Sequence, residues 1–329
     1  MRLSILDQAP ISNGQTPKDA LDTAVELAQL GDKLGYERYW IAEHHDLFGL
    51  ACPNPSVMIS LLGAKTERIR LGAGAVLLPY YQPFQVAETY NLLQTLYPDR
   101  IDIGLGRAPG GSAEVSLALS HNYLQEVSKY PEKIDALQQF LTGTVPEDSQ
   151  FATITPTPLP EVPPTIWLLG TSEKSALLAA EKGMPYAFGH FMTSSNGPEI
   201  VQTYREKFSE DFGTSPYVIG SVEVVCADTE KEAEKIALST MLWRVNQEKQ
   251  ISDNTVPSIA EAEKYDFSEK EREKITRMKE KMIIGNPEQV KEKLMDLQKQ
   301  FKVDEWMIIT ILHEPKAKFR SYELLQKMF

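Results

Sequence analysis

The sequence predicts an α/β fold, a (β/α)8 TIM barrel, from two observations. Eight apolar segments of strand length alternate with segments that carry helix start signals, which is the element order of such a barrel. Polar or glycine-rich stretches follow several of these strands, where barrel proteins bind their ligands. The strands are expected at 3–6, 39–42, 69–78, 100–105, 165–169, 186–189, 217–227 and 305–312. We therefore expect a single domain over residues 1–329, with an extended mobile loop after the seventh strand.

In the first half of the chain, local signals place a helix after each strand. Thr16 is expected to cap the first helix, with a proline at its first position, and Gly35 to end it. The second helix begins near Pro55 and the third at Pro83. The strand at 69–78 is almost continuously apolar, as expected for a strand buried on both faces.

In the second half, Ser172 and the pair Asn286-Pro287 are the clearest helix starts. The proline-rich stretch 151–164 is expected to form a short hairpin or an extended excursion. Residues 251–264 are highly charged and contain few large apolar side chains, so they are expected to form a mobile lid over the barrel mouth or a disordered surface insertion. Helices are expected at 16–34, 55–65, 83–96, 113–141 with interruptions, 172–182, 198–211, 229–250, 286–301 and 316–328.

A Rossmann domain is the alternative fold. It requires a glycine fingerprint after the first strand, where this chain has Gln8-Ala9-Pro10-Ile11. The later run Gly104-Leu105-Gly106 starts such a motif, but Arg107-Ala108-Pro109 breaks it. The barrel is therefore the better prediction.

Composition excludes several classes of protein. The net charge of −12, without a long basic cluster, argues against binding to nucleic acid or to anionic membranes. No apolar run approaches the ~20 residues of a membrane span, and the N-terminus lacks a signal-peptide pattern. Cys52 and Cys226 indicate neither a disulfide framework nor a metal site, and they fit a cytoplasmic protein.

Ionisable and glycine-rich residues follow three of the predicted strands. Glu43-His44-His45 comes directly after the second strand, which places imidazoles at the barrel mouth. Gly106-Arg107 follows the fourth strand, and Gly170-Thr171-Ser172 leads into the helix that contains Ser175. A guanidinium and a helix N-terminus at neighbouring strand ends favour a phosphorylated ligand.

Each of these residues also has a structural interpretation. A histidine can cap a helix, Arg107 can pair with a carboxylate at the mouth, and Ser172 can be a plain N-cap. Gln8 and His190, at the ends of the first and sixth strands, are weaker candidates for the lining of a substrate pocket.

Several motifs together resemble the bacterial luciferase-like flavin monooxygenases. They are Ile41 to His45, Ile69 to Pro79, Pro83 to Glu88, Asp99 to Arg107, Ala179 to Pro185 and Gly285 to Glu288. The resemblance covers nearly the whole chain, and the set is specific although each piece alone is modest. It implies a barrel that binds reduced FMN, delivered by a separate flavin reductase.

Matched residue by residue, the resemblance implies roles for the candidate site. Arg107 takes the place of the family's phosphate-binding arginine, with Gly170, Thr171, Ser172 and Ser175 around the phosphate. His44 matches the histidine needed for productive oxidation. Gly74 and Ala75 lie beneath the flavin ring, joined by a cis peptide that bulges the strand. Thr171 and Gly106 depart from luciferase itself, which puts light emission and a long-chain aldehyde substrate in doubt.

The function implied is oxidation of a small organic substrate with reduced FMN and oxygen. His44 is expected to assist proton transfer, and Glu43 to orient His44 unless it only caps a helix or forms a surface salt bridge. A dry cavity under a lid limits loss of hydrogen peroxide. The alternatives are a deazaflavin-dependent dehydrogenase of the same fold, a flavin-binding protein without turnover, and a phosphate-binding barrel enzyme unrelated to flavin.

A homodimer is expected through the second and third helices, as the family pairs. Together these helices carry more apolar residues than one barrel wall requires. The residues concerned are Met58, Leu61, Leu62, Tyr90, Leu93 and Leu96.

Overall fold

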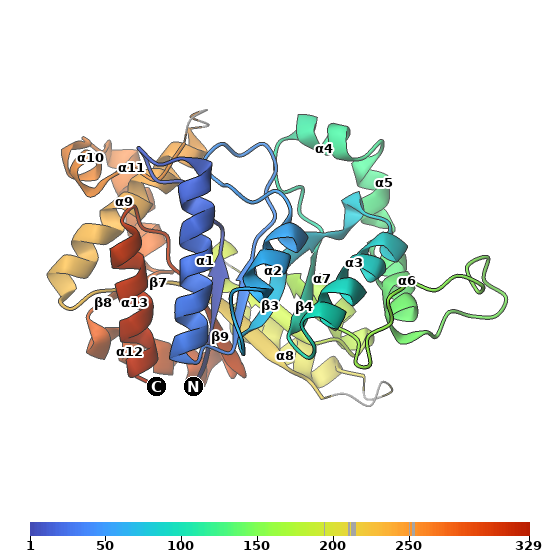
Figure 1. Cartoon of the computed structure of the whole chain (residues 1–329). Helices are drawn as coiled ribbons and strands as arrows, with labels where there is room; N and C mark the ends of the chain where they lie inside the picture. Colours follow the sequence, from blue (N-terminus) through green and yellow to red (C-terminus); the bar gives the residue numbers. More distant parts are fainter. Residues whose placement is uncertain (194, 210, 212–214, 250, 252–253) are drawn as a thin grey trace.

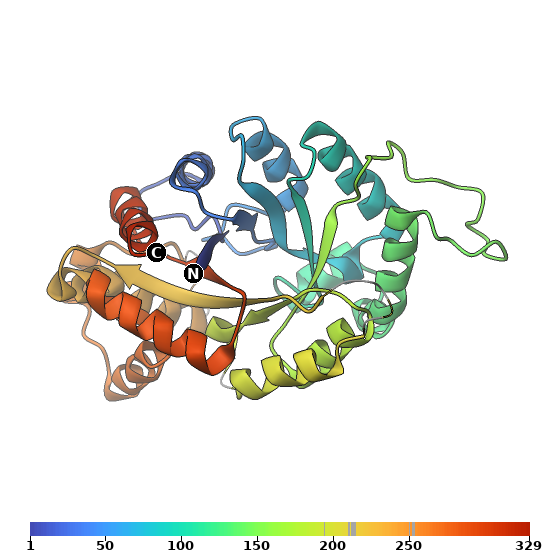
Figure 2. The ribbon, with the colours of Figure 1, turned by 90° about the horizontal axis from the view of Figure 1, so that it is seen from below.

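The computed structural model describes residues 1–193, 195–209, 211, 215–249, 251 and 254–329. Eight parallel strands close into a barrel, and helices surround it (Figures 1 and 2). The ring is β1 (Arg2–Asp7), β2 (Arg38–Ile41), β3 (Arg70–Leu77), β4 (Ile101–Gly106), β5 (Thr165–Gly170), β6 (Tyr186–Gly189), β7 (Val218–Cys226) and β9 (Glu305–Ile309). Pairing of β9 with both β7 and β1 closes the ring. The predicted (β/α)8 barrel is confirmed.

The helices follow the predicted order, with small shifts at their ends. They are α1 (Pro17–Leu34), α2 (Pro55–Gly63), α3 (Pro83–Leu96), α4 (Ala113–Leu119), α5 (Tyr123–Ser128), α6 (Tyr130–Thr142), α7 (Glu173–Glu181), α8 (Gly197–Lys207), α9 (Glu230–Glu248), α10 (Ile259–Lys264), α11 (Glu269–Lys279), α12 (Pro287–Phe301) and α13 (Pro315–Lys327). Short 3-10 turns η1 (Leu78–Tyr80) and η2 (His190–Met192) follow β3 and β6. The Thr16 hydroxyl accepts a hydrogen bond from the N–H of Asp19, and Gly35 ends α1 in the left-handed conformation, so both predicted caps are confirmed. None of the helices in the described ranges is long and apolar enough to cross a membrane.

Two apolar layers pack the barrel. One fills its interior and includes Leu6, Trp40, Trp167, Ile219 and Met307. The larger layer lies between the outer face of the strands and the helices. Both chain ends lie at one end of the barrel, and α4, α10 and α11 lie toward the other (Figure 1). That second end is where the carboxyl ends of the parallel strands open.

An ion cluster fills the barrel near the end that carries the termini. Arg38 contacts Asp102 at 2.7 Å and Glu305 at 2.8 Å, and Arg70 contacts Asp102 at 2.6 Å. Burial alone would raise the pKa of Asp102, but the two guanidinium groups hold it below its ordinary value. Such a buried network makes removal of one partner costly, and it closes the floor of the barrel beneath any ligand site.

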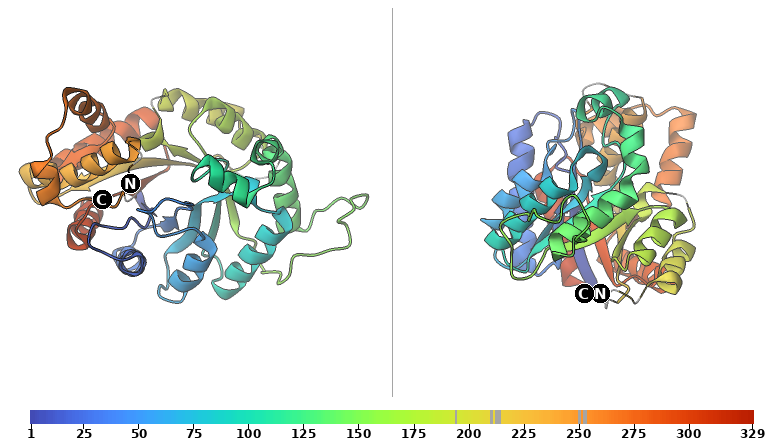
Figure 3. Two further views of the ribbon diagram at one scale, coloured as in Figure 1. Left: turned by 90° about the horizontal axis from the view of Figure 1, so that it is seen from above. Right: turned by 90° about the vertical axis from the view of Figure 1, so that its right-hand side faces the viewer.

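Three segments were not fully predicted. A short strand, β8 (Ile283–Gly285), pairs with the end of β7 outside the closed ring, where no strand was expected. The excursion 143–164 has no helix or strand and stands away from the barrel (Figures 1 and 3), as the extended alternative predicted. Helix α8 ends at Lys207, four residues earlier than expected, because Phe208 already has extended backbone.

The segment 251–264 packs more than its composition suggested. Val256 is fully buried, its N–H donates to Ile11 O, and its carbonyl accepts from Asn13 N, both at 2.8 Å. Ser258 and Glu261 form a capping box that starts α10. Val256, Pro257 and Ala262 are buried, so 254–264 packs more closely than its charged composition indicated, whereas residues 252–253 lie outside the described ranges. Mobility of the segment stays a prediction.

Candidate active site

A central cavity of about 410 Å³ lies at the carboxyl ends of the strands. All eight barrel strands contribute to its wall, through Leu6, Trp40, Gly74, Gly106, Leu169, Ala187, Ser221 and Met307. Ten of the eleven residues selected from the sequence line it, namely Gln8, Glu43, His44, Gly74, Ala75, Arg107, Gly170, Thr171, Ser172 and Ser175. The structure therefore brings these ten residues together on one cavity.

Small residues form one wall of this cavity. A side chain at Gly74 would lie 2.8 Å from Leu6 Cδ1, and one at Gly106 would lie 2.8 Å from Ala75 Cβ. The peptide bond between Gly74 and Ala75 is cis, and the register of β3 against β4 shifts between Gly74 and Val76. The predicted cis peptide and its bulge are confirmed. The wall is flat because Gly74 and Gly106 carry no side chains, and a Cβ at either position would lie too close to a neighbouring side chain.

The entrance from β4 carries a cation. Arg107 follows the strand directly and is exposed, and its guanidinium makes no hydrogen bond or ion pair with a described residue. Tyr123 donates its hydroxyl to the Arg107 carbonyl at 2.6 Å, which fixes the backbone there. The alternative interpretation, a salt bridge to a carboxylate at the mouth, is not what the structure shows. The side chain is available to an anion.

The loop from β5 into α7 lies on the same cavity. The Ser172 hydroxyl caps the helix, and Ser175 Oγ donates to Ser172 O at 2.6 Å and contacts Tyr186 OH at 2.9 Å. A Cβ at Gly170 would lie 2.2 Å from Ser175 Oγ, so glycine is required there. The N-cap interpretation of Ser172 is therefore confirmed. The positive end of the helix dipole and the Thr171 hydroxyl remain to attract an anion.

Glu43 contacts His45 rather than His44, which corrects the expectation that Glu43 orients His44. Glu43 Oε1 accepts from His45 Nε2 at 2.8 Å and from the Tyr81 hydroxyl at 2.7 Å, and Oε2 accepts from Leu77 N at 3.1 Å. Residues two apart in extended chain point to the same side, whereas the residue between them points away. Glu43 is therefore a buried anchor for three donors and not a partner of His44.

His44 is neutral and has no partner at its buried ring nitrogen. Its Nδ1 atom makes no hydrogen bond with a described residue. Burial, together with the neighbouring His45, lowers the pKa of His44 to about 4. The imidazole faces the cavity uncharged near neutral pH, where it can donate or accept one hydrogen bond.

His190 does not line the cavity, which corrects its selection as a pocket residue. Its ring packs edge-on against Phe301, with ring centroids 4.9 Å apart. The next two residues of the same 3-10 turn, Phe191 and Met192, line the cavity instead. No sequence signal distinguishes these positions, because the direction of each side chain depends on the turn after β6. Within the described part of the chain, no group of three His, Cys, Asp or Glu side chains is placed to hold a metal ion.

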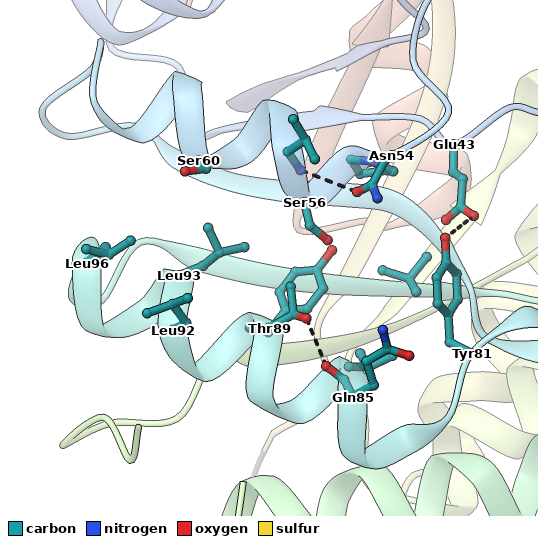
Figure 4. A pocket seen from close by; sticks show the side chains of 15 residues that line it. Glu43, Asn54, Ser56, Ser60, Tyr81, Gln85, Thr89, Leu92, Leu93 and Leu96 are labelled. Carbon is teal, nitrogen blue, oxygen red and sulfur yellow. Dashed lines mark hydrogen bonds between the residues drawn. The ribbon is translucent and has the colours of Figure 1, made fainter. Parts of the chain in front are cut away.

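A separate groove of about 440 Å³ runs between α2 and α3 (Figure 4). Leu92, Leu93 and Leu96 lie along α3 toward one end, and the hydroxyl of Tyr81 points to Glu43 at the other. Glu43 lines both this groove and the central cavity. The groove therefore ends beside the candidate active site.

The fold and this site define a (β/α)8-barrel protein with a ligand cavity where barrel enzymes carry their active sites. Residues 1–302 match the family model described as luciferase-like monooxygenase. The chain belongs to the luciferase-like monooxygenase family.

Relatives match over nearly their whole lengths. The chain is 41% identical to the Bacillus subtilis (strain 168) protein YceB, covering 100% of this chain and 99% of the relative. It is 35% identical to N-acetyl-S-alkylcysteine monooxygenase of the same organism, covering 99% and 97%. The crystal structure of apo-MsnO8 superposes with a TM-score of 0.86 at 33% identity, covering 100% of this chain and 98% of that chain.

A more distant structure shows the same fold. It is the oxygenating constituent of 3,6-diketocamphane monooxygenase from Pseudomonas putida in complex with FMN. The TM-score is 0.72 at 20% identity, and the match covers 100% of this chain and 97% of that chain.

Proposed function

We propose that the protein is a flavin-dependent monooxygenase that uses reduced FMN and molecular oxygen to oxidise a small organic substrate. One observation carries the proposal. A single cavity joins two side chains across a wall of glycine and alanine. They are Arg107, whose guanidinium makes no ion pair with a described residue, and the neutral His44, whose Nδ1 makes no hydrogen bond with one. A planar, phosphorylated cofactor fits this arrangement of charge, flat wall and hydrogen-bonding group.

Residues at different positions around the cavity would have different roles. Arg107 and the N-terminal end of α7 would hold the phosphate, and Gly74 and Ala75 would pack beneath the ring system. When bound, reduced FMN would supply the two electrons that send one oxygen atom of O2 to the substrate and the other to water. His44 would hold or move a proton beside the reacting atoms, and Leu6, Trp40 and Met307 would keep that region apolar.

Further parts of the proposal concern partners. We propose that a separate flavin reductase supplies the reduced FMN and that the protein acts as a cytoplasmic homodimer. A first substrate to test is an N-acetyl-S-alkylcysteine, because a relative that is 35% identical and matches over 97% of its length is named for that compound. The thioether sulfur is a group to which one oxygen atom can be added.

The experiment mixes the protein with reduced FMN, oxygen and a panel of small organic sulfides, and measures oxidised product and hydrogen peroxide per FMN. We expect product in wild type. In His44→Ala, FMN affinity is retained, product falls at least about 100-fold, and hydrogen peroxide rises. His121→Ala is the control, because His121 is exposed and lies outside the central cavity.

Other outcomes identify the alternatives. Hydride transfer from a reduced deazaflavin, without oxygen uptake, indicates the dehydrogenase. FMN binding without oxygen-dependent product indicates a binding protein. Failure to bind any flavin leaves a phosphate-binding barrel of another kind.

A further inference from the structure

A second cavity, of about 650 Å³, adjoins the central one at the barrel mouth. Phe191 lines both cavities. Ser221 on β7 lines the central cavity, and Glu223, two residues further along the same face of the same strand, lines the second. The second cavity therefore continues the central one outward, between β7 and the helices α9 and α11.

Positive charge is in excess in the second cavity. Its lining carries four cations and three carboxylates. Two cations are paired, Arg244 with Glu223 at 2.7 Å and Lys274 with Glu248. The remaining two, Arg277 and Lys281, make no ion pair or side-chain hydrogen bond with a described residue.

The position of Lys281 places this charge near the barrel mouth. Burial lowers the pKa of His190, at the end of β6, and the ammonium of Lys281 lowers it further. The remaining lining carboxylate, Glu280, is exposed. The cavity therefore offers a cationic face that an anion of the size of a carboxylate can contact.

The same cavity also requires a hydrogen-bond donor. Glu223 is 3% exposed, its Oε2 atom faces Arg244, and its Oε1 atom is buried without a hydrogen bond to any described residue. A buried carboxylate oxygen without a donor is costly. A ligand that supplies an N–H or O–H group would remove this cost.

We propose that the second cavity binds the carboxylate end of the substrate, with Arg277 and Lys281 on the anion and Glu223 on a neighbouring N–H or O–H group. The substrate is then a small organic acid whose oxidisable end passes Phe191 into the central cavity. This inference rests on the proposed function, since it names the substrate class of that site. It assigns substrate recognition to Glu223 on β7, Arg277 on α11 and Lys281 in the turn that follows α11.

The test uses the flavin-free protein and isothermal titration calorimetry. The probe is N-acetyl-L-methionine, which carries a carboxylate, an amide N–H and a thioether. The comparison compounds are its methyl ester, which lacks the charge, and 4-(methylthio)butanoate, which lacks the amide. We expect the acid to bind at least about tenfold more tightly than the ester, with the amide-free acid between them.

Two double variants separate the cavity from general charge effects. Arg277→Gln/Lys281→Gln should bind acid and ester equally. Lys270→Gln/Lys279→Gln removes two exposed cations of α11 that do not line the cavity, and it should keep the preference for the acid. FMN affinity should be the same in wild type and in both variants.

Equal binding of acid and ester to wild type, binding of neither, or an acid preference that survives in Arg277→Gln/Lys281→Gln overturns the inference. Failure of wild type to bind FMN overturns the proposed function instead. The two failures are distinguishable because the acid titration contains no flavin.

Discussion

Glu43 Oε1 lies 2.8 Å from Nε2 of His45, whereas Nδ1 of His44, one residue nearer in sequence, makes no hydrogen bond with a described residue. The two histidines thus have different surroundings. His45 is tied to a buried carboxylate, and His44 is left to the cavity.

Glu43→Gln should lower the stability of the protein. The substitution replaces one acceptor oxygen with an N–H₂ group among three donors, from His45, Tyr81 and Leu77. We expect a loss of about 1–3 kcal/mol in the free energy of unfolding, measured by urea denaturation at pH 7. Glu67→Gln, at an exposed position whose carboxylate makes no hydrogen bond or ion pair with a described residue, should change it by under about 0.5 kcal/mol. An unchanged stability for Glu43→Gln would show that the three bonds are dispensable.

His44 should make stability fall as the pH is lowered. Its pKa is about 4 in the folded protein, against an ordinary value of 6.5 that holds in the unfolded chain. The unfolded state therefore binds more protons than the folded state between these values, and stability decreases as pH falls from about 6.5 toward 4. His44→Asn should show a smaller decrease over this interval than wild type in parallel denaturation curves. NMR titration of the His44 ring near pH 6.5 in the folded protein would contradict the prediction.

Arg107→Ala should weaken FMN binding by about ten- to a hundredfold, because it removes charge-assisted hydrogen bonds worth roughly 1.5–3 kcal/mol each. Flavin fluorescence titration at fixed salt measures the change. Lys33→Ala, an exposed cation of α1 away from the cavity, is the control. Equal FMN affinity in Arg107→Ala and wild type would show that Arg107 does not bind the FMN phosphate.

Most of the fold could be predicted because its signals are local. Continuous apolar strands and caps such as Thr16 depend on neighbouring residues, and the structure confirms them. The strand β8 could not be predicted, because its three residues become a strand only by pairing with the end of β7. Composition also underestimated the packing of 254–264, where Val256 is buried and two of its backbone hydrogen bonds join it to Ile11 and Asn13.

The positions of the site residues along the chain could be predicted from the sequence, but the directions of their side chains could not. Ten candidate residues lie on one cavity because the carboxyl ends of parallel strands meet at one face. Which side chain faces the cavity depends on turns of one or two residues, so Glu43 was wrongly expected to orient His44 and His190 was wrongly expected to line the pocket. The second cavity was not found, because its cations come from helices far from the strand ends in sequence.

Val256→Ala should loosen the segment 251–264. Val256 is fully buried and links this segment to Ile11 and Asn13, and losing two methyl groups costs roughly 1–2 kcal/mol. We expect limited proteolysis within 251–264 to accelerate about five- to thirtyfold, and bound FMN to slow cleavage in wild type. Ile251→Ala is the control, because Ile251 is exposed. If the protease first cuts another internal segment of the chain, then 251–264 is not the most mobile internal segment.

The homodimer prediction now rests on the exposed apolar side chains around the groove between α2 and α3, and not on all six residues selected from the sequence. Met58, Leu62, Tyr90 and Leu93, selected from the sequence, are buried within the protein's own core, whereas Leu61 and Leu96 are exposed. Two further apolar side chains, Val57 and Leu92, are also exposed and line the groove. These two helices therefore do present an apolar surface, but it is formed by partly different residues from those selected from the sequence.

Val57→Lys/Leu96→Lys should therefore convert the protein to a monomer. Both positions line the groove and are more than half exposed, so the substitutions disturb a partner surface and not the core. Light scattering should give about twice the chain mass of 37.0 kDa for wild type and the chain mass itself for the variant. Leu117→Lys, on α4 at 69% exposure, is the matched control and should stay dimeric. A monomeric wild type at micromolar concentration would remove the interface, and a dimeric double variant would place it elsewhere, because burying two unpaired lysines from each copy would cost several kcal/mol at this groove.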